Sequence, residues 1–69
     1  KQNMNVTIND VSIVIPDGST LADALATKEI KSGGIATAVN GTVIAASSRA
    51  THILAEGDKI VIIKAFYGG

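Results

Sequence analysis

Residues 4–15 read MNVTINDVSIVI, and apolar side chains recur at every second position on both sides of the central Asn9-Asp10 pair. Such alternation is typical of strands that bury one face. Asn and Asp tolerate the positive φ angles that a two-residue hairpin turn requires. The stretch therefore predicts a β-hairpin with strands over residues 4–8 and 11–15, ended by the turn residues Pro16-Asp17-Gly18.

A single helix is expected after this hairpin. Thr20, with Asp23 three residues later, is a weaker form of the capping box that begins many helices. Good helix formers continue from Leu21 to Ile30 with apolar side chains on one face, and Gly33-Gly34 ends the helical stretch.

Three further strands are expected in the second half of the chain. Asn40-Gly41 is the strongest hairpin signal of the sequence, because both residue types accept a positive φ. A β-branched run predicts the last strand, and a loop with at most one helical turn is expected over residues 45–51. The expected strands span residues 35–39, 42–44 and 59–64, and Ile53-Leu54 is expected to hold the loop against the core.

This order of elements defines the fold class. A helix that returns from a hairpin must lay its apolar stripe on one sheet face, which makes a two-layer α+β domain. The first and last strands are the most apolar, so we expect them to be neighbours at the sheet centre. We therefore expect a β-grasp fold, a mixed sheet of four to five strands packed on one main helix. The domain is expected over residues 4–69, with Met4 as the natural start, residues 1–3 outside the fold and residues 65–69 as a flexible reactive tail.

Composition excludes several classes of function. Six Lys and Arg balance six Asp and Glu, whereas nucleic acids and anionic membranes are bound by basic surfaces. The chain of 69 residues has no Cys and a single His, His52, so disulfides, zinc–thiolate sites and multi-histidine metal sites are excluded. No apolar run reaches the roughly 18–20 residues that span a bilayer. We expect a soluble, cytoplasmic domain that binds neither nucleic acid nor membrane.

The last residues carry the most informative chemistry. Phe66 and Tyr67 are the only aromatic residues, and they stand beside Gly68-Gly69. Neighbouring residues of an extended chain point in opposite directions, so at least one aromatic ring is expected to face a partner. A diglycine can pass through a narrow channel, and we expect the Gly69 carboxylate to react, with Gly68 giving access to it. A frayed chain end is the alternative interpretation.

The final strand also predicts a docking surface. Ile60 and Ile62 alternate with Val61 and Ile63, so one pair faces the core and the other must face outward. An exposed aliphatic strip is typical of an interaction surface, although a scattered run of strand-forming residues is the alternative. The expected partner-binding residues are Val14, Val61, Ile63, Phe66 and Tyr67.

The remaining charged and titratable side chains are interpreted as structural. Arg49, Lys59 and Lys64 are expected to be solvated surface charges. His52 has no Ser, Cys or carboxylate pattern near it that predicts a catalytic triad. The sequence therefore predicts no catalytic or metal site in the body of the domain.

Several short motifs occur along the chain in a specific order and spacing. They are Met4-Asn5-Val6, Asn9-Asp10, Pro16-Asp17-Gly18-Ser19-Thr20-Leu21, Ala38-Val39-Asn40-Gly41 with Val43, Glu56-Gly57-Asp58-Lys59-Ile60 and Gly68-Gly69. A β-grasp domain that runs into a C-terminal diglycine is similar to ubiquitin and to the bacterial sulfur carriers, and these motifs together resemble the ThiS family of thiamine-biosynthesis sulfur carriers. Tyr67 stands where many members of that family carry a third glycine.

The resemblance implies a carrier and co-substrate rather than an enzyme. A ubiquitin-activating-enzyme-like adenylyltransferase would use ATP and magnesium to adenylate Gly69, and this chain itself would bind no cofactor. A persulfide sulfur donor would then yield a C-terminal thiocarboxylate, which a thiazole synthase would consume. Two alternatives remain, the small subunit of molybdopterin synthase and a non-catalytic ubiquitin-like interaction module.

Overall fold

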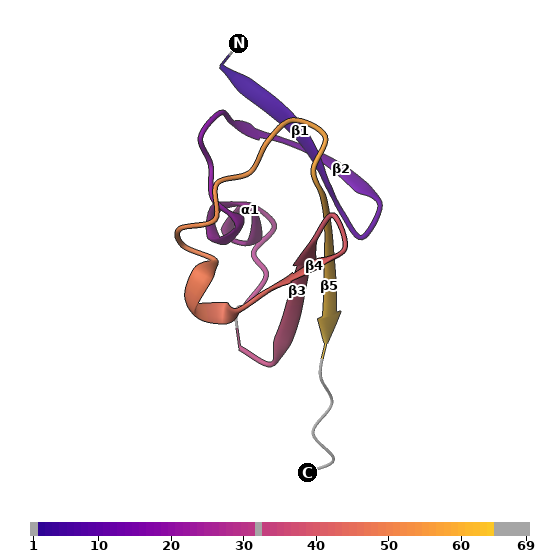
Figure 1. Cartoon of the computed structure of the whole chain (residues 1–69). Coiled ribbons are helices and arrows are strands. Elements are labelled where there is room, and N and C mark those ends of the chain that lie inside the picture. The colour runs from indigo at the N-terminus through magenta and orange to yellow at the C-terminus, as the bar shows by residue number, and fades with distance from the viewer. Residues whose placement is uncertain (1, 32, 65–69) are drawn as a thin grey trace.

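The computed structural model describes residues 2–31 and 33–64 of the chain. Five strands, one α-helix and one short 3-10 helix form in the described residues, in nearly the order that the sequence predicts (Figure 1). The elements are β1 (Asn3–Ile8), β2 (Val11–Pro16), α1 (Leu21–Thr27), β3 (Ile35–Val39), β4 (Thr42–Ile44), the 3-10 helix η1 (Ala46–Ser48) and β5 (Lys59–Lys64).

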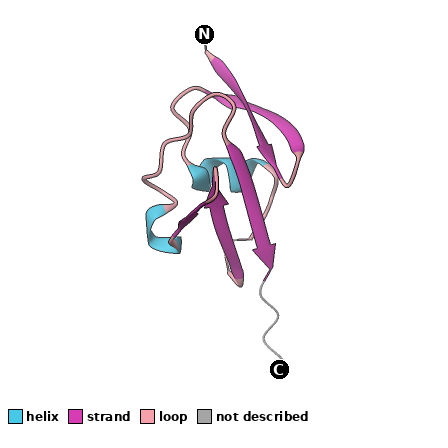
Figure 2. Ribbon diagram, turned by 45° about the vertical axis from the view of Figure 1, so that its right-hand side comes forward, coloured by secondary structure: helices cyan, strands magenta, loops and turns pink. Residues whose placement is uncertain are grey.

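The strands form one mixed sheet in the order β2-β1-β5-β3-β4. β5 lies in the middle, parallel to β1 and antiparallel to β3, and the two outer pairs are antiparallel hairpins. α1 covers one face of this sheet (Figures 1 and 2). The apolar core lies between them and includes Val6, Ile15, Leu21 and Ile60. The predicted β-grasp fold, with the first and last strands as central neighbours, is confirmed.

Both hairpins turn on pairs led by Asn. Asn9 and Asp10 have φ angles of 50° and 69°, and Asn40 and Gly41 have φ angles of 52° and 85°. Two consecutive positive φ angles define the turn type whose twist matches that of the flanking strands. The local chemistry of these pairs therefore sets the register of both hairpins.

The helix begins where the sequence predicts. The Thr20 hydroxyl accepts from the Asp23 backbone N–H at 3.2 Å, and the Asp23 carboxylate accepts from the Thr20 N–H at 3.0 Å. This reciprocal pair satisfies two of the donors that a helix start leaves free. Leu21, Ala24 and Leu25 point into the core.

The helix ends three residues earlier than predicted, at Thr27 rather than Ile30. Glu29 adopts a φ of 56°, its N–H donates to the carbonyl of Ala26, and the Ile30 N–H donates to that of Leu25. This is the Schellman arrangement, which normally has Gly in the left-handed position. Ile30 then packs against the core, so burial of its side chain ends the helix before the glycine pair is reached.

Three other expectations are wrong. The expectation that residues 1–3 lie outside the fold is wrong for Gln2 and Asn3, because strand pairing extends beyond Met4: β1 begins at Asn3, and the Gln2 carbonyl accepts from the Asp17 N–H. Leu54 is buried, but the adjacent Ile53 is exposed, so only Leu54 holds the loop on the core. Arg49 is buried rather than solvated, because its guanidinium lies against β3, where it donates to the Thr37 hydroxyl and the Ile35 carbonyl.

Substitutions on the two faces of β5 test this arrangement. Replacing Ile60, which is 1% exposed, by Ala should lower the free energy of unfolding by about 2–4 kcal/mol, because it opens a cavity in the core. The neighbouring Val61→Ala variant is the matched control, with an expected loss below about 1 kcal/mol. Urea unfolding of both variants measures the difference, and equal losses would contradict the face assignment.

Candidate functional site

The outer face of β5, away from α1, carries exposed aliphatic side chains. Ile60 is buried on the helix side, whereas Val61 and Ile63 are 45% and 60% exposed on the opposite side. Successive side chains of a strand point to opposite faces, so this exposure follows directly from the alternation in the sequence. The predicted outward orientation of Val61 and Ile63 is therefore confirmed.

Neighbouring strands extend this exposed apolar surface. Ala36 of β3 lies opposite Ile63, Ala38 lies opposite Val61, and Ala38 also lies opposite Val43 of β4. Val43 is 75% exposed, and the small alanines between the larger residues cover little of them. These residues form one contiguous apolar surface, here called the outer patch: Ala36, Ala38, Val43, Val61 and Ile63.

Val14 shares this face but is separate from the outer patch. It is 60% exposed, as predicted, and pairs with Asn5 of β1. β1 meets β5 at the Thr7–Lys59 pair. The polar side chains of Asn5, Thr7 and Lys59 therefore lie between Val14 and the outer patch. The exposure of Val14 was predictable from the alternation, but its isolation depends on the register between β1 and β5.

Asparagine side chains of the two hairpin turns hold β5 in place. The Asn9 amide donates to the Ile62 carbonyl at 3.3 Å, and its oxygen accepts from the Ile62 N–H at 2.8 Å. Asn40 accepts from the Lys59 N–H at 3.0 Å and donates to the Asp58 carboxylate at 2.9 Å. β1 ends at Ile8, so the Asn9 side chain pairs with β5 where the strand itself has stopped. The sequence pattern predicts hairpin turns at both asparagines but not the hydrogen bonds that their side chains make to β5.

The tail lies outside the described residues. β5 ends at Lys64, opposite Ile35, the first residue of β3. The predicted reactive residues Gly68 and Gly69 and the predicted partner-binding residues Phe66 and Tyr67 follow this point in the sequence. Their roles stay predictions. The outer patch, however, includes Ile63, only two residues before the tail begins.

The body of the domain offers little other chemistry. Among residues 2–31 and 33–64, no three His, Cys, Asp or Glu side chains are grouped so that they could hold a metal ion. In the same part of the chain, no helix is long and apolar enough to cross a membrane.

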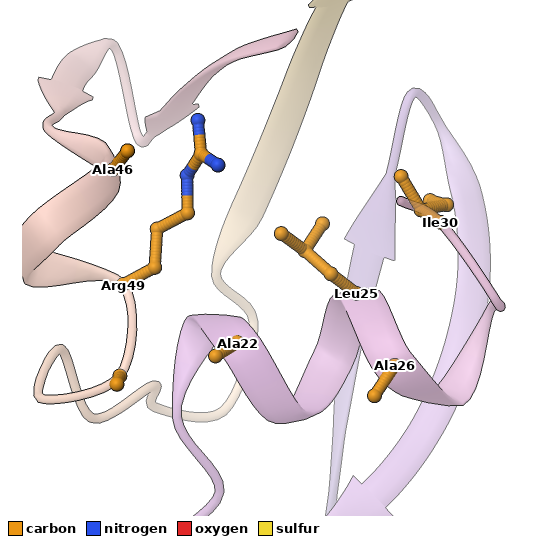
Figure 3. A pocket seen from close by; sticks show the side chains of 7 residues that line it. Ala22, Leu25, Ala26, Ile30, Ala46 and Arg49 are labelled. Carbon is orange, nitrogen blue, oxygen red and sulfur yellow. The ribbon is translucent and has the colours of Figure 1, made fainter. Parts of the chain in front are cut away.

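A groove of about 420 Å³ lies between α1 and the η1 segment (Figure 3). It is lined by Ala22, Leu25, Ala26, Ile30, Ala46, Arg49 and Ala50.

The five-strand order, the single helix and the exposed sheet face define a ubiquitin-like β-grasp protein. The sequence matches the ThiS family over residues 2–69, so the chain belongs to this family of small sulfur carriers. Its fold is similar to a solved structure of the thiamine biosynthesis protein (ThiS) from Geobacter metallireducens. The TM-score is 0.78 over 96% of this chain and 99% of that chain, at 19% identity. No curated protein matches the sequence.

The Asn9 side chain provides a test of how β5 is held. Asn9→Gly keeps the positive φ accessible but removes both hydrogen bonds to Ile62, so we expect a loss of about 1–2 kcal/mol in unfolding free energy. The Ile62 amide should also exchange faster with solvent. Asp10→Gly, in the same turn, is the matched control and should change neither quantity appreciably. Equal effects of both variants would show that the turn backbone, and not the Asn9 side chain, supports β5.

Proposed function

We propose that this carrier transports sulfur as a thiocarboxylate on Gly69 and delivers it for the formation of the thiamine thiazole. The observation that supports this most is the family match, which runs through to residue 69 and includes the terminal diglycine. The position of β5 adds to it, because the strand that contributes Val61 and Ile63 to the outer patch is also the strand that precedes this diglycine in the sequence.

The chemistry begins with activation of the chain end. A carboxylate is a poor electrophile because its charge is delocalised and oxide is a poor leaving group. An oxygen of the Gly69 carboxylate attacks the α-phosphorus of ATP, pyrophosphate leaves, and an acyl adenylate forms. ATP and magnesium belong to the activating partner, an adenylyltransferase similar to ubiquitin-activating enzymes, and not to this chain.

Sulfur then replaces one oxygen of the terminal carboxylate. A persulfide on another protein attacks the activated carbonyl carbon, and AMP leaves with the former carboxylate oxygen. A thiol cleaves the resulting acyl disulfide, becomes part of a disulfide itself, and releases the thiocarboxylate. This chain has no Cys, so its own side chains do not relay the sulfur. A thiazole synthase consumes the thiocarboxylate.

The outer patch is the proposed docking surface for the activating partner. Val61, Ile63 and Val43 expose aliphatic side chains that water solvates poorly, and an apolar partner surface would remove them from water. Phe66 and Tyr67 follow in the sequence and extend the same interaction along the tail. Val14 lies across polar residues from the outer patch, so its contribution is smaller than that of Val61.

Removal of Gly69 tests the assignment of the reactive end. We expect the deletion to leave the unfolding free energy unchanged, because Gly69 has no side chain to pack and stands five residues after β5 in the sequence, and to abolish adenylation. Intact-mass measurement after incubation with the activating enzyme, ATP and a persulfide donor should show the unmodified mass. The full chain should gain the difference between one sulfur and one oxygen atom. An unmodified full chain, with enzymes proven on another carrier, would contradict the proposal.

Threonine substitutions test the outer patch. Val61→Thr combined with Ile63→Thr keeps the β-branched shape but adds hydroxyls, so we expect the KM for this chain in adenylation to rise roughly tenfold. Val11→Thr is the matched control, since Val11 is 54% exposed on the other face of the sheet, and it should leave the KM unchanged. An unchanged KM in the double variant would place docking elsewhere.

A further inference from the structure

Arg49 is a buried charged side chain that the proposed function does not use. It is 4% exposed. Its Nε donates to the Thr37 hydroxyl at 3.1 Å and its Nη2 donates to the Ile35 carbonyl at 2.9 Å. Burial of a guanidinium is unfavourable unless its donors find acceptors, and apolar residues of similar size often stabilise a core as well. Stability alone is therefore a weak explanation for an arginine at this position.

The hydrogen bond to Ile35 connects Arg49 to the end of β5, because Ile35 lies opposite Lys64. Ile35 begins β3 and follows Gly33-Gly34, and Gly34 has a φ of 72° that few other residues would adopt. The same residue lies opposite Lys64, the last described residue of β5. The guanidinium thus holds the start of β3, and through strand pairing it holds the end of β5.

Thr37 accepts the other hydrogen bond that Arg49 donates to β3. Its hydroxyl accepts from Arg49 and donates to the Ile44 carbonyl at 3.0 Å, which joins β3 to β4. The contact to Thr37 lies two residues further along β3 from the end of β5 than the contact to Ile35. The Thr37 hydroxyl can therefore be removed while the contact from Arg49 to Ile35 is kept.

Arg49 also lines the groove between α1 and the η1 segment. The groove beside it is lined by small side chains such as Ala22, Ala46 and Ala50. Figure 3 shows the arginine side chain on one wall of this groove and Leu25 on the opposite wall. The hydrogen bonds to Thr37 and Ile35 direct the guanidinium toward the start of β3.

We propose that Arg49 is a positioning residue that fixes the end of β5 at Lys64, so that Gly69, five residues later in the sequence, reaches the activating enzyme from a defined origin. This inference rests on the proposed function. The physical reason is that a separated end of β3 and β5 must be ordered again each time the enzyme binds. The outer patch would be affected as well, because Ile63 lies opposite Ala36 at the same end.

Arg49→Met, which keeps a similar length without donors, tests the proposal. We expect the amides of Ala36 and Ile63 to exchange at least roughly tenfold faster, and the KM in adenylation to rise on the order of tenfold with kcat nearly unchanged. The Val6 amide, in β1, should exchange as before. The thermal midpoint should change little, because an apolar side chain replaces a buried charge.

Thr37→Val is the matched control. It removes the hydroxyl that accepts from Arg49 Nε but keeps the hydrogen bond from Arg49 to the Ile35 carbonyl. It should therefore lower the thermal midpoint without changing the KM or the amide exchange at Ile63. Arg49→Lys retains a charge but cannot donate to Thr37 and Ile35 in the same fork geometry, and should be intermediate. If Arg49→Met does not fold, the lysine variant decides on the same measurements.

Unchanged exchange at Ala36 and Ile63 in the arginine variants would overturn the inference, and so would a KM that follows the thermal midpoint across all three variants. Amide exchange is measured on the carrier alone. The exchange rates therefore show whether Arg49 holds the ends of β3 and β5 even if the full chain is never adenylated. Absence of adenylation would contradict the proposed function alone.

Discussion

The pairing of β5 between β1 and β3 is the constraint on which the rest of the structure depends. It places the last strand of the chain at the centre of the sheet, where neighbours support it on both edges. One face of β5 then contributes Ile60 to the core, while the other presents Val61 and Ile63 outside. Gly68 and Gly69 follow β5 in the sequence, so the reactive residue of the proposed function is connected to a strand that is paired on both edges.

This arrangement leaves β5 apolar on both faces although a helix covers only one. A sheet of this kind normally alternates apolar and polar residues along each strand. Val61 and Ile63 depart from that rule, and the exposed aliphatic surface they form is unfavourable in the free protein. In the proposed function, docking of the activating partner removes this penalty. The same strand thus stabilises the fold through one face and, in the proposed function, recruits a partner through the other.

Features that depend on neighbouring residues were predictable from sequence, and those that depend on distant ones were not. Both hairpins followed from the Asn-led turns, and the two faces of β5 followed from alternation. The helix end at Thr27 was missed because Glu29 takes a left-handed conformation that the burial of Ile30 favours. The burial of Arg49 and the isolation of Val14 were missed because only the assembled sheet brings their neighbours together.

A backbone NMR titration of the labelled carrier with the activating enzyme and ATP tests whether the enzyme binds the outer patch and the diglycine at the same time. We expect the signals of the outer patch and of Gly68 and Gly69 to change together, over one range of enzyme concentration, while those of α1 stay in place. Changes centred on α1 or on the β2 edge, with the signals of the outer patch undisturbed, would contradict it.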